Sequence, residues 1–426
     1  MLDGERRPSG QKCELSRGKR WLFSAVIFLM VWGVCELIFV LVSPSTLPPV
    51  NAVNPRVFVE RYRSTITRLI EGRTTVVELS PHLGWTHKPW GKAGSSRING
   101  QRMRADHDYS LLPPPDTLRI ATFGDSFVFG TGVEIEQTWQ FLVEQSVPDV
   151  EVLNFGVSGY GTDQALLRYV DEGVRFSPNV VTLGYIVHNS RRNKNTFRPL
   201  LRTATGLPMG KPRFVVEGDR LVLIENPLPK PADYQRLLDD PEATLEKIGA
   251  YDDLYKQFKS SPVPLLGRSP TFRAVRYWSG RLRALVKRSF RRDPGTDWYR
   301  LGGGNDPLLF RILDEFVVVA EKNRARPVVM LFPTLFDYRD LARTGETGYQ
   351  RVRAFLEGQN HPHVDVAEFF QEHLDQGGKV EDLFVNGARG AHYSPLGQAI
   401  IADAMVKMLG LHGCQTQPAL AQSEPE

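Results

Sequence analysis

Hydrophobic and polar positions follow two rhythms through the body of the chain. Short runs rich in β-branched and aromatic residues predict strands over 118–123, 150–155, 180–186, 327–332 and 364–366. Between these runs, apolar residues at helical spacing predict helices over 138–145, 162–174, 307–323, 349–357 and 395–409. Because strands and helices alternate, the sequence predicts a parallel sheet covered by helices on both faces.

The alternation is interrupted over residues 191–305. This segment contains a predicted hairpin, with strands over 213–216 and 221–224, followed by irregular and helical sequence. The alternation then resumes with the helix at 307. We therefore interpret 191–305 as an insertion.

The remaining α/β sequence has the length of one domain. Residues 116–190 and 306–409 together comprise about 180 residues, which is the size of a compact domain. A proline-bounded stalk and N-terminal extension over 44–115 precedes this domain. A polar tail over 410–426 follows it, and its composition predicts disorder.

One long apolar run predicts a membrane anchor. Residues 21–43 are long enough to cross a bilayer as a helix, and Glu36 is their single charged residue. Basic residues gather in 1–20 and are sparse after the run, which predicts a cytoplasmic N-terminus. A cleaved signal peptide is the alternative, but the run is long for one and lacks a small-residue cleavage site. We expect a single-pass protein of the inner (plasma) membrane, with its main domain in the periplasm or outside the cell.

Composition excludes several classes of function. The three cysteines, Cys13, Cys35 and Cys414, lie outside the body of the chain, which argues against a disulfide framework and a thiolate metal site. The net charge of +5 is too small to indicate nucleic-acid binding without a patterned surface. The sequence contains no metal-ligand cluster and no phosphate-binding glycine loop, so we predict no cofactor.

Four residues that can support acyl chemistry follow predicted strands or lie near the C-terminus. Ser126, directly after the strand 118–123, sits where a nucleophile can stand clear of its sheet. Gly159 can offer its N–H to a ligand, and Asn189 can offer a side-chain amide. His392 is the natural proton acceptor. Since the carboxyl ends of parallel strands share one crevice, we expect the four to converge, although each residue alone could be a cap or turn former.

In this order, the blocks Gly124–Ser126, Asn154–Gly159, Asn189 and His392 resemble the SGNH, or GDSL, hydrolase superfamily and its membrane-anchored bacterial subset. The resemblance implies a flavodoxin-like three-layer α/β/α sandwich with a parallel sheet. It implies that Ser126 is the nucleophile and His392 the base. It further implies an oxyanion hole made by the N–H groups of Ser126 and Gly159 and the side chain of Asn189.

The sequence departs from the superfamily pattern at two places. Asn189 is followed by Ser190 instead of aspartate, and no Asp or Glu lies between 383 and 391, where the superfamily places its triad aspartate. Loss of the orienting carboxylate costs up to about 10⁴ in rate. Three possibilities stay open: the domain does not catalyse, the enzyme is a slow dyad, or another group orients His392, the candidates being a backbone carbonyl, Asp382 and Asn386.

These observations predict a membrane-anchored extracytoplasmic serine esterase. It would remove O-acyl groups, in the first place O-acetyl, from an envelope glycan or a lipid through an acyl-enzyme. One alternative is a glycan O-acetyltransferase with the same nucleophile, which would need a membrane acyl-donor protein as partner. The other is a catalytically inactive glycan-binding envelope protein, which the missing aspartate favours. The expected partners are the acylated substrate and, through 21–43, the lipid bilayer, and not nucleic acid.

Overall fold

The computed structural model describes residues 17–42, 55–203, 205–255, 306–385 and 392–410, together with Ser269, Thr271 and Ser279. The chain forms two compact units, one of Met1–Val53 with Phe258–Arg292 and one of Asn54–Gln257 with Asp293–Glu426. In the first unit, helix α1 (Arg17–Val42) contains a window, Trp21–Ile38, that is long and apolar enough to cross a membrane. This helix is compatible with the predicted anchor, while its topology stays a prediction.

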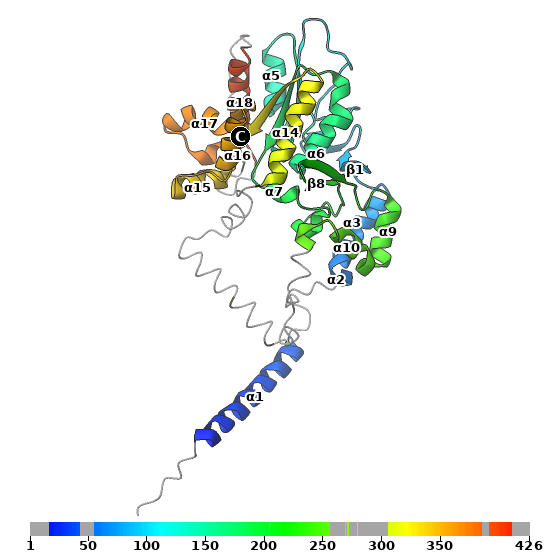
Figure 1. Ribbon diagram of the computed structural model, residues 1–426, viewed down its shortest axis with the longest axis vertical. Helices are drawn as coiled ribbons and strands as arrows, with labels where there is room; N and C mark the ends of the chain where they lie inside the picture. The colour runs from blue at the N-terminus through cyan, green and yellow to red at the C-terminus, as the bar shows by residue number, and fades with distance from the viewer. Residues whose placement is uncertain are drawn as a thin grey trace, which may run out of the picture. The chain divides into compact units, whose positions relative to one another are not determined.

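A five-stranded parallel sheet forms the centre of the second unit (Figure 1). Its strands lie side by side in the order β6, β5, β7, β10 and β11. Numbered along the chain, this is the order 2-1-3-4-5 of flavodoxin-like folds. The predicted fold class is therefore confirmed. The strands are β5 (Leu118–Phe123), β6 (Val150–Asn154), β7 (Val180–Tyr185), β10 (Arg326–Leu331) and β11 (His363–Asp365).

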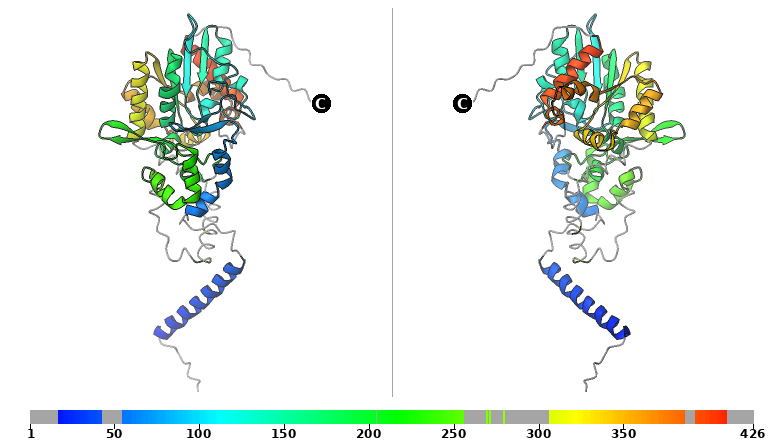
Figure 2. Two further views of the ribbon diagram at one scale, coloured as in Figure 1. Left: turned by 90° about the vertical axis from the view of Figure 1, so that its right-hand side faces the viewer. Right: turned by 90° about the vertical axis from the view of Figure 1, so that its left-hand side faces the viewer.

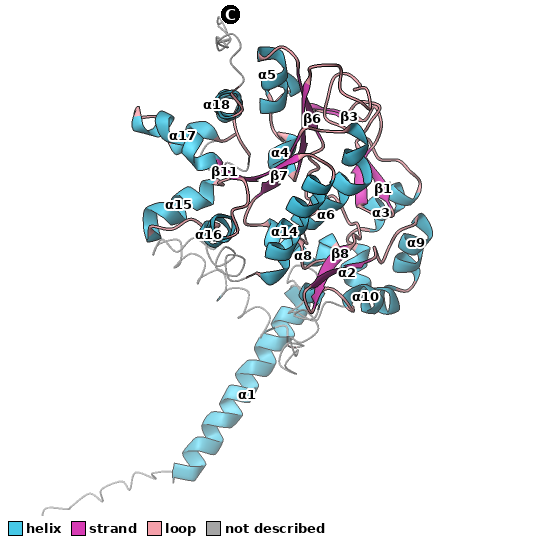
Figure 3. Cartoon of the chain, turned by 45° about the horizontal axis from the view of Figure 1, so that its top comes forward, coloured by secondary structure: helices cyan, strands magenta, loops and turns pink. Residues whose placement is uncertain are grey.

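Helices cover both faces of this sheet (Figure 3). One face packs against α6 (Thr162–Arg168), α14 (Pro307–Lys322) and α16 (Gln350–Gly358). The other packs against α5 (Trp139–Ser146), α17 (Val366–Asp375) and α18 (Pro395–Met408). Strand β10 shows why both layers are apolar. Its side chains point alternately to opposite faces, so Val329 and Leu331 enter one core while Val328 and Met330 enter the other.

Two predicted elements end earlier than expected. The α-helix predicted over 162–174 ends at Arg168 and continues as a π-helical turn, η2 (Tyr169–Gly173), and a short 3-10 helix, η3 (Val174–Phe176). A Cβ on Gly173 would lie 2.3 Å from the ring of Phe123, so this turn approaches β5 closely only because it has a glycine. The strand predicted to reach 366 stops at Asp365, whose side chain accepts the N–H of Ala367 and begins α17.

The predicted hairpin is confirmed as β8 (Arg213–Glu217) and β9 (Arg220–Ile224), which project beside the sheet (Figure 2). It belongs to the compact unit that holds the sheet, and the predicted boundaries of domain and insertion stay a prediction. Helices of the N-terminal extension pack on helices that follow the hairpin, α2 on α10 and α3 on α9. These elements are α2 (Pro55–Glu60), α3 (Arg63–Ile70), α9 (Pro231–Asp239) and α10 (Pro241–Gly249).

The other described elements are short or were not predicted. In the N-terminal extension they are β1 (Val77–Ser80), β2 (Gly84–His87), β3 (Lys92–Ala93) and β4 (Ser96–Arg97). Near the carboxyl ends of the strands they are α4 (Ser126–Phe129), η1 (Ile135–Gln137), α7 (Asn189–Arg192) and α8 (Arg198–Leu201). Beyond β10 they are α15 (Leu335–Thr344) and η5 (Val380–Leu383).

Candidate active site

Ser126 stands at the carboxyl end of β5, where the chain turns sharply into α4. Asp125 caps this helix, because its Oδ1 accepts the N–H of Phe127 at 2.9 Å. A Cβ on Gly124 would lie 2.4 Å from Cγ2 of Val128, so the turn requires glycine there. Ser126 keeps 8% of its surface exposed. The Gly-Asp-Ser sequence thus presents the serine hydroxyl at the edge of the sheet.

The structure brings His392 to this hydroxyl. Its Nε2 lies 2.8 Å from Oγ of Ser126, although the two residues are 266 positions apart. The chain around it is held by Tyr393, which is buried and donates its hydroxyl to the carbonyl of Pro333 at 2.7 Å. The ring of His392 also contacts Phe127, with ring centroids 5.1 Å apart. This geometry suits transfer of the serine proton to the imidazole.

Burial keeps the imidazole neutral. Desolvation lowers the pKa of His392 below its usual value, Asp125 raises it and Arg192 lowers it, and desolvation has the largest effect. A neutral imidazole at pH 7 can accept a proton, which is what a general base requires.

The loop between β6 and α6 carries Gly159, one of the three predicted oxyanion donors. Gly159 has φ of 89°, a left-handed conformation that favours glycine. Within the described residues, the amides of Ser126 and Gly159 donate to no protein acceptor. Asn189 is fully buried beside this loop and donates from Nδ2 to the carbonyl of Tyr160 at 3.3 Å. An amide carries two N–H donors, so this bond uses only one of those on Asn189.

Sequence reasoning missed Arg192, which ties two of the blocks together. Its Nη1 donates to Oδ2 of Asp125 at 2.7 Å and to the carbonyl of Tyr160 at 2.8 Å. Arg192 therefore connects the turn of Ser126 to the loop of Gly159. A signal existed: Arg192 lies three residues after Asn189, which is one turn of a helix.

The structure does not bring the carboxylate of Asp382, a candidate to orient His392, into hydrogen-bonding contact with that ring. Its carboxylate accepts the N–H of Lys379 at 3.0 Å, which caps η5, and lies 3.7 Å from Nε2 of His373. Among the described residues, no carboxylate is hydrogen-bonded to His392. The second candidate, Asn386, lies outside the described residues. A backbone carbonyl stays a prediction.

The N-terminal extension packs against the loop that carries Gly159, a contact that the sequence did not predict. Trp85 on β2 donates from Nε1 to the carbonyl of Ser158 at 3.3 Å. Its own carbonyl accepts the hydroxyl of Tyr160, and the two rings pack edge to face with centroids 5.6 Å apart. Both side chains are buried, so this contact fixes the backbone on either side of Gly159.

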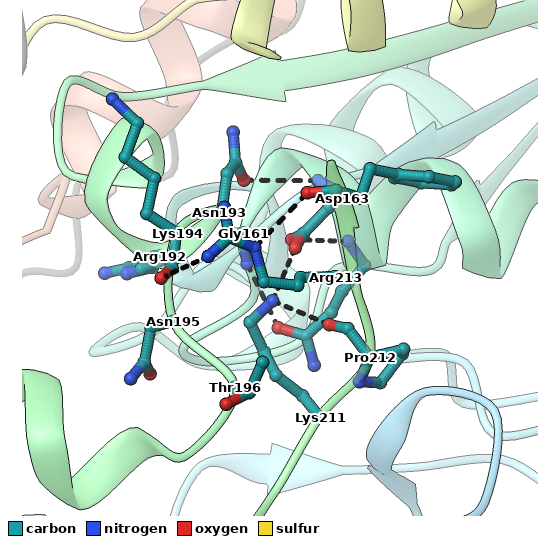
Figure 4. A network of polar contacts seen from close by, with 12 residues as sticks. Gly161, Asp163, Arg192, Asn193, Lys194, Asn195, Thr196, Lys211, Pro212 and Arg213 are labelled. Carbon is teal, nitrogen blue, oxygen red and sulfur yellow. Dashed lines mark hydrogen bonds and ion pairs between the residues drawn. The ribbon is translucent and has the colours of Figure 1, made fainter. Parts of the chain in front are cut away.

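A buried ion pair holds the next segment (Figure 4). Lys211 is bonded through Nζ to Oδ2 of Asp163 and to the carbonyl of Pro212 at 2.9 Å. Asp163 lies in the first turn of α6, and its N–H donates to Oδ1 of Asn193 at 3.3 Å. Further along, Oδ2 of Asp252 accepts the N–H of Thr196 at 2.6 Å. Residues before and after the hairpin thus anchor the chain that follows Asn189 and Arg192.

No group of three or more His, Cys, Asp or Glu suited to a metal ion occurs in the described part of the chain. The parallel sheet holds a Ser–His pair at its carboxyl edge.

Comparison with known proteins gives solved structures only. No family model matches the chain, and no curated protein matches it. A catalytic variant of an acetylxylan esterase from Geobacillus stearothermophilus is 12% identical, with a TM-score of 0.35, over 72% of this chain and 100% of its own. A G-D-S-L lipolytic family member from Veillonella parvula is 12% identical, with a TM-score of 0.33, over 69% of this chain and 99% of its own.

A third structure, assigned to the G-D-S-L family and from Desulfitobacterium hafniense, is 10% identical, with a TM-score of 0.32, over 68% of this chain and 99% of its own. G-D-S-L proteins are the group that the sequence blocks resemble. At these identities and TM-scores the similarity adds nothing about chemistry.

Proposed function

We propose that this chain is a serine esterase that removes short acyl groups, in the first place acetyl, from an envelope glycan. The observation that supports it most is the 2.8 Å contact between Nε2 of His392 and Oγ of Ser126, with a neutral imidazole. Polar groups adjoin the site. Oγ1 of Thr131 lies 3.1 Å from Oγ of Ser158, the residue before Gly159. Such hydroxyls suit a sugar ester better than a fatty acyl chain.

The proposed reaction has two halves. Oγ of Ser126 attacks the ester carbonyl carbon while Nε2 of His392 takes the serine proton, and the oxyanion receives hydrogen bonds from the amides of Ser126 and Gly159 and from Nδ2 of Asn189. The C–O bond to the sugar then breaks, and His392 returns its proton to the leaving oxygen. In the second half His392 takes a proton from water, whose oxygen attacks the acyl carbon. The bond to Oγ of Ser126 then breaks and His392 returns the proton to Oγ, which releases the carboxylic acid and free Ser126.

We also propose that α1 anchors the enzyme in the plasma membrane with its N-terminus in the cytoplasm. The support is the apolar window Trp21–Ile38 and the excess of basic residues before it. Alkaline phosphatase fused after residue 410 is expected to be active in the periplasm, and the same fusion after residue 16 inactive. The opposite pattern would contradict the orientation.

Covalent labelling tests the nucleophile. The full chain in detergent micelles is expected to react with a fluorophosphonate and to hydrolyse p-nitrophenyl acetate, and Ser126→Ala is expected to do neither. Ser146→Ala is the matched control, because Oγ of Ser146 donates to the carbonyl of Val143 within α5 and is not bonded to His392. Absence of labelling in the unmodified chain would favour the inactive glycan-binding protein. Acetylated acceptor glycan formed faster than free acetate would indicate an acetyltransferase.

A further inference from the structure

The segment that carries Asn189 is strongly basic. Between 189 and 203 the chain has no acidic residue and five basic ones: Arg191, Arg192, Lys194, Arg198 and Arg202. At least two of these charges have carboxylate partners among the described residues. Arg192 pairs with Asp125 at 2.7 Å, and Lys194 pairs with Asp306 at 3.3 Å. The segment therefore places an excess of positive charge beside the turn of Ser126.

Arg198 is aimed at the loop of the candidate oxyanion hole. Its Nη1 donates to the carbonyl of Gly159 at 2.9 Å, its Nε donates to Oγ1 of Thr205 at 3.2 Å, and its guanidinium lies 5.8 Å from the ring centroid of Trp85. No carboxylate of the described residues is bonded to it. Its Nη2 donates to no described residue, so part of the guanidinium fork is available to a ligand.

The charges in this cluster act on one another. The pKa of Arg198 is lowered to about 9, mainly by burial and further by Arg192 and Arg202, while Asp125 opposes them. Arg202, at the end of α8, is exposed, and its side chain has no hydrogen bond or ion pair within the described residues. An anion bound between these groups would relieve their repulsion, and a guanidinium matches a carboxylate in two parallel hydrogen bonds.

We infer that Arg198 and Arg202 bind a carboxylate of the substrate beside the scissile ester, with Arg192 adding to the field, so that the substrate is an acylated acidic glycan. This inference rests on the proposed esterase function. A glycan is favoured over an anionic phospholipid, because no large apolar side chain is exposed between 189 and 203 in the described residues. The hydroxyls of Thr131, Ser158 and Thr205 lie next to the cluster and can bond to sugar hydroxyls.

The test compares two esters that differ in charge. The full chain in detergent micelles is assayed on an O-acetylated oligouronate and on an O-acetylated neutral xylo-oligosaccharide of equal length, with p-nitrophenyl acetate as a third substrate. We expect kcat/KM to be on the order of tenfold or more higher for the acidic ester, since charge-assisted hydrogen bonds are the strong ones. Added salt is expected to reduce this preference.

Arg202→Gln is the decisive variant, because this side chain is exposed and its loss should not affect folding. It is expected to reduce the acidic-to-neutral ratio of kcat/KM about tenfold, mainly through KM. Arg198→Gln is expected to act in the same direction. Arg326→Gln is the matched control: Arg326 is exposed at the amino end of β10, the opposite edge of the sheet, and should leave the ratio unchanged.

Four outcomes would overturn the inference. Equal rates on the two glycans would exclude the carboxylate site, and so would a preference for the acidic glycan that Arg202→Gln leaves intact. In both cases hydrolysis of p-nitrophenyl acetate would still support the esterase function. Faster release of acyl groups from phosphatidylglycerol vesicles than from the oligouronate would identify a lipase. Failure to hydrolyse any of these esters would refute the esterase function itself, and the inference with it.

Discussion

The buried pair of Lys211 and Asp163 offers a sharp test of how the active-site segment is held. Both side chains are almost completely buried, with exposed fractions of 2% and 0%. Burial lowers the pKa of Lys211, and Asp163 opposes that effect. Asp163→Asn keeps the size of the side chain but leaves a buried ammonium without its counter-ion. Breaking a buried pair in this way costs about 3–5 kcal/mol of unfolding free energy.

The protein can limit this cost by deprotonating Lys211. The usual pKa of the group is 10.5, so holding it neutral at pH 7 costs about 5 kcal/mol, which is the upper limit of the loss. In Asp163→Asn the pKa of Lys211 in the folded chain falls further below its pKa in the unfolded chain. At pH values between these two pKa values, the unfolded chain binds more protons than the folded chain. Stability therefore rises with pH in that range. Between pH 7 and pH 9 the variant should recover up to about 2.7 kcal/mol.

Urea unfolding of the full chain in detergent micelles measures these changes, with the buried side chains of Trp85 and Trp139 as fluorescent reporters. Asp219→Asn is the matched control, because its pair with Arg311 is exposed, at 94% and 43%, and is expected to contribute nothing measurable. Adding Lys211→Met to Asp163→Asn removes the buried charge and should restore part of the stability. If Asp163→Asn costs no more than Asp219→Asn, or its cost does not fall at pH 9, the reasoning is wrong.

The remaining predictions concern activity on p-nitrophenyl acetate. Because the pKa of His392 is lowered, kcat/KM should decrease on acidification only below pH 6.5. A pH profile of kcat/KM with its midpoint above 6.5 would indicate a carboxylate partner on the imidazole. Gly159→Ala should reduce kcat by 10²-fold or more, which is roughly the effect of losing an oxyanion donor. The reason is that Gly159 has φ of 89° and that a Cβ there would lie 2.6 Å from Nη1 of Arg198. An active variant would exclude this loop from the site. Arg192→Gln should lower kcat about tenfold or more by releasing Tyr160 from Asp125, whereas an effect confined to KM would contradict a positioning role.

The sequence alone determined the type and order of the main elements. Strands such as β5 and β7 are runs of apolar residues bounded by turn formers, and α14 repeats apolar residues at helical spacing, so each element is specified by neighbours along the chain. The same local information specified the Gly-Asp-Ser turn and the apolar helix α1. Parallel strands require helical crossovers, which made the sandwich predictable as well.

Tertiary structure decided which polar groups meet. Asp382 looked available to His392 by its position in the sequence, yet its carboxylate caps its own helical turn. Arg192 is one of five basic residues between 189 and 203, and only folding placed it between Asp125 and Tyr160. Lys211 and Asp163 are 48 positions apart and pair because packing removes both from water. Such contacts depend on how distant segments return to one another, and burial, not local periodicity, determines their energy.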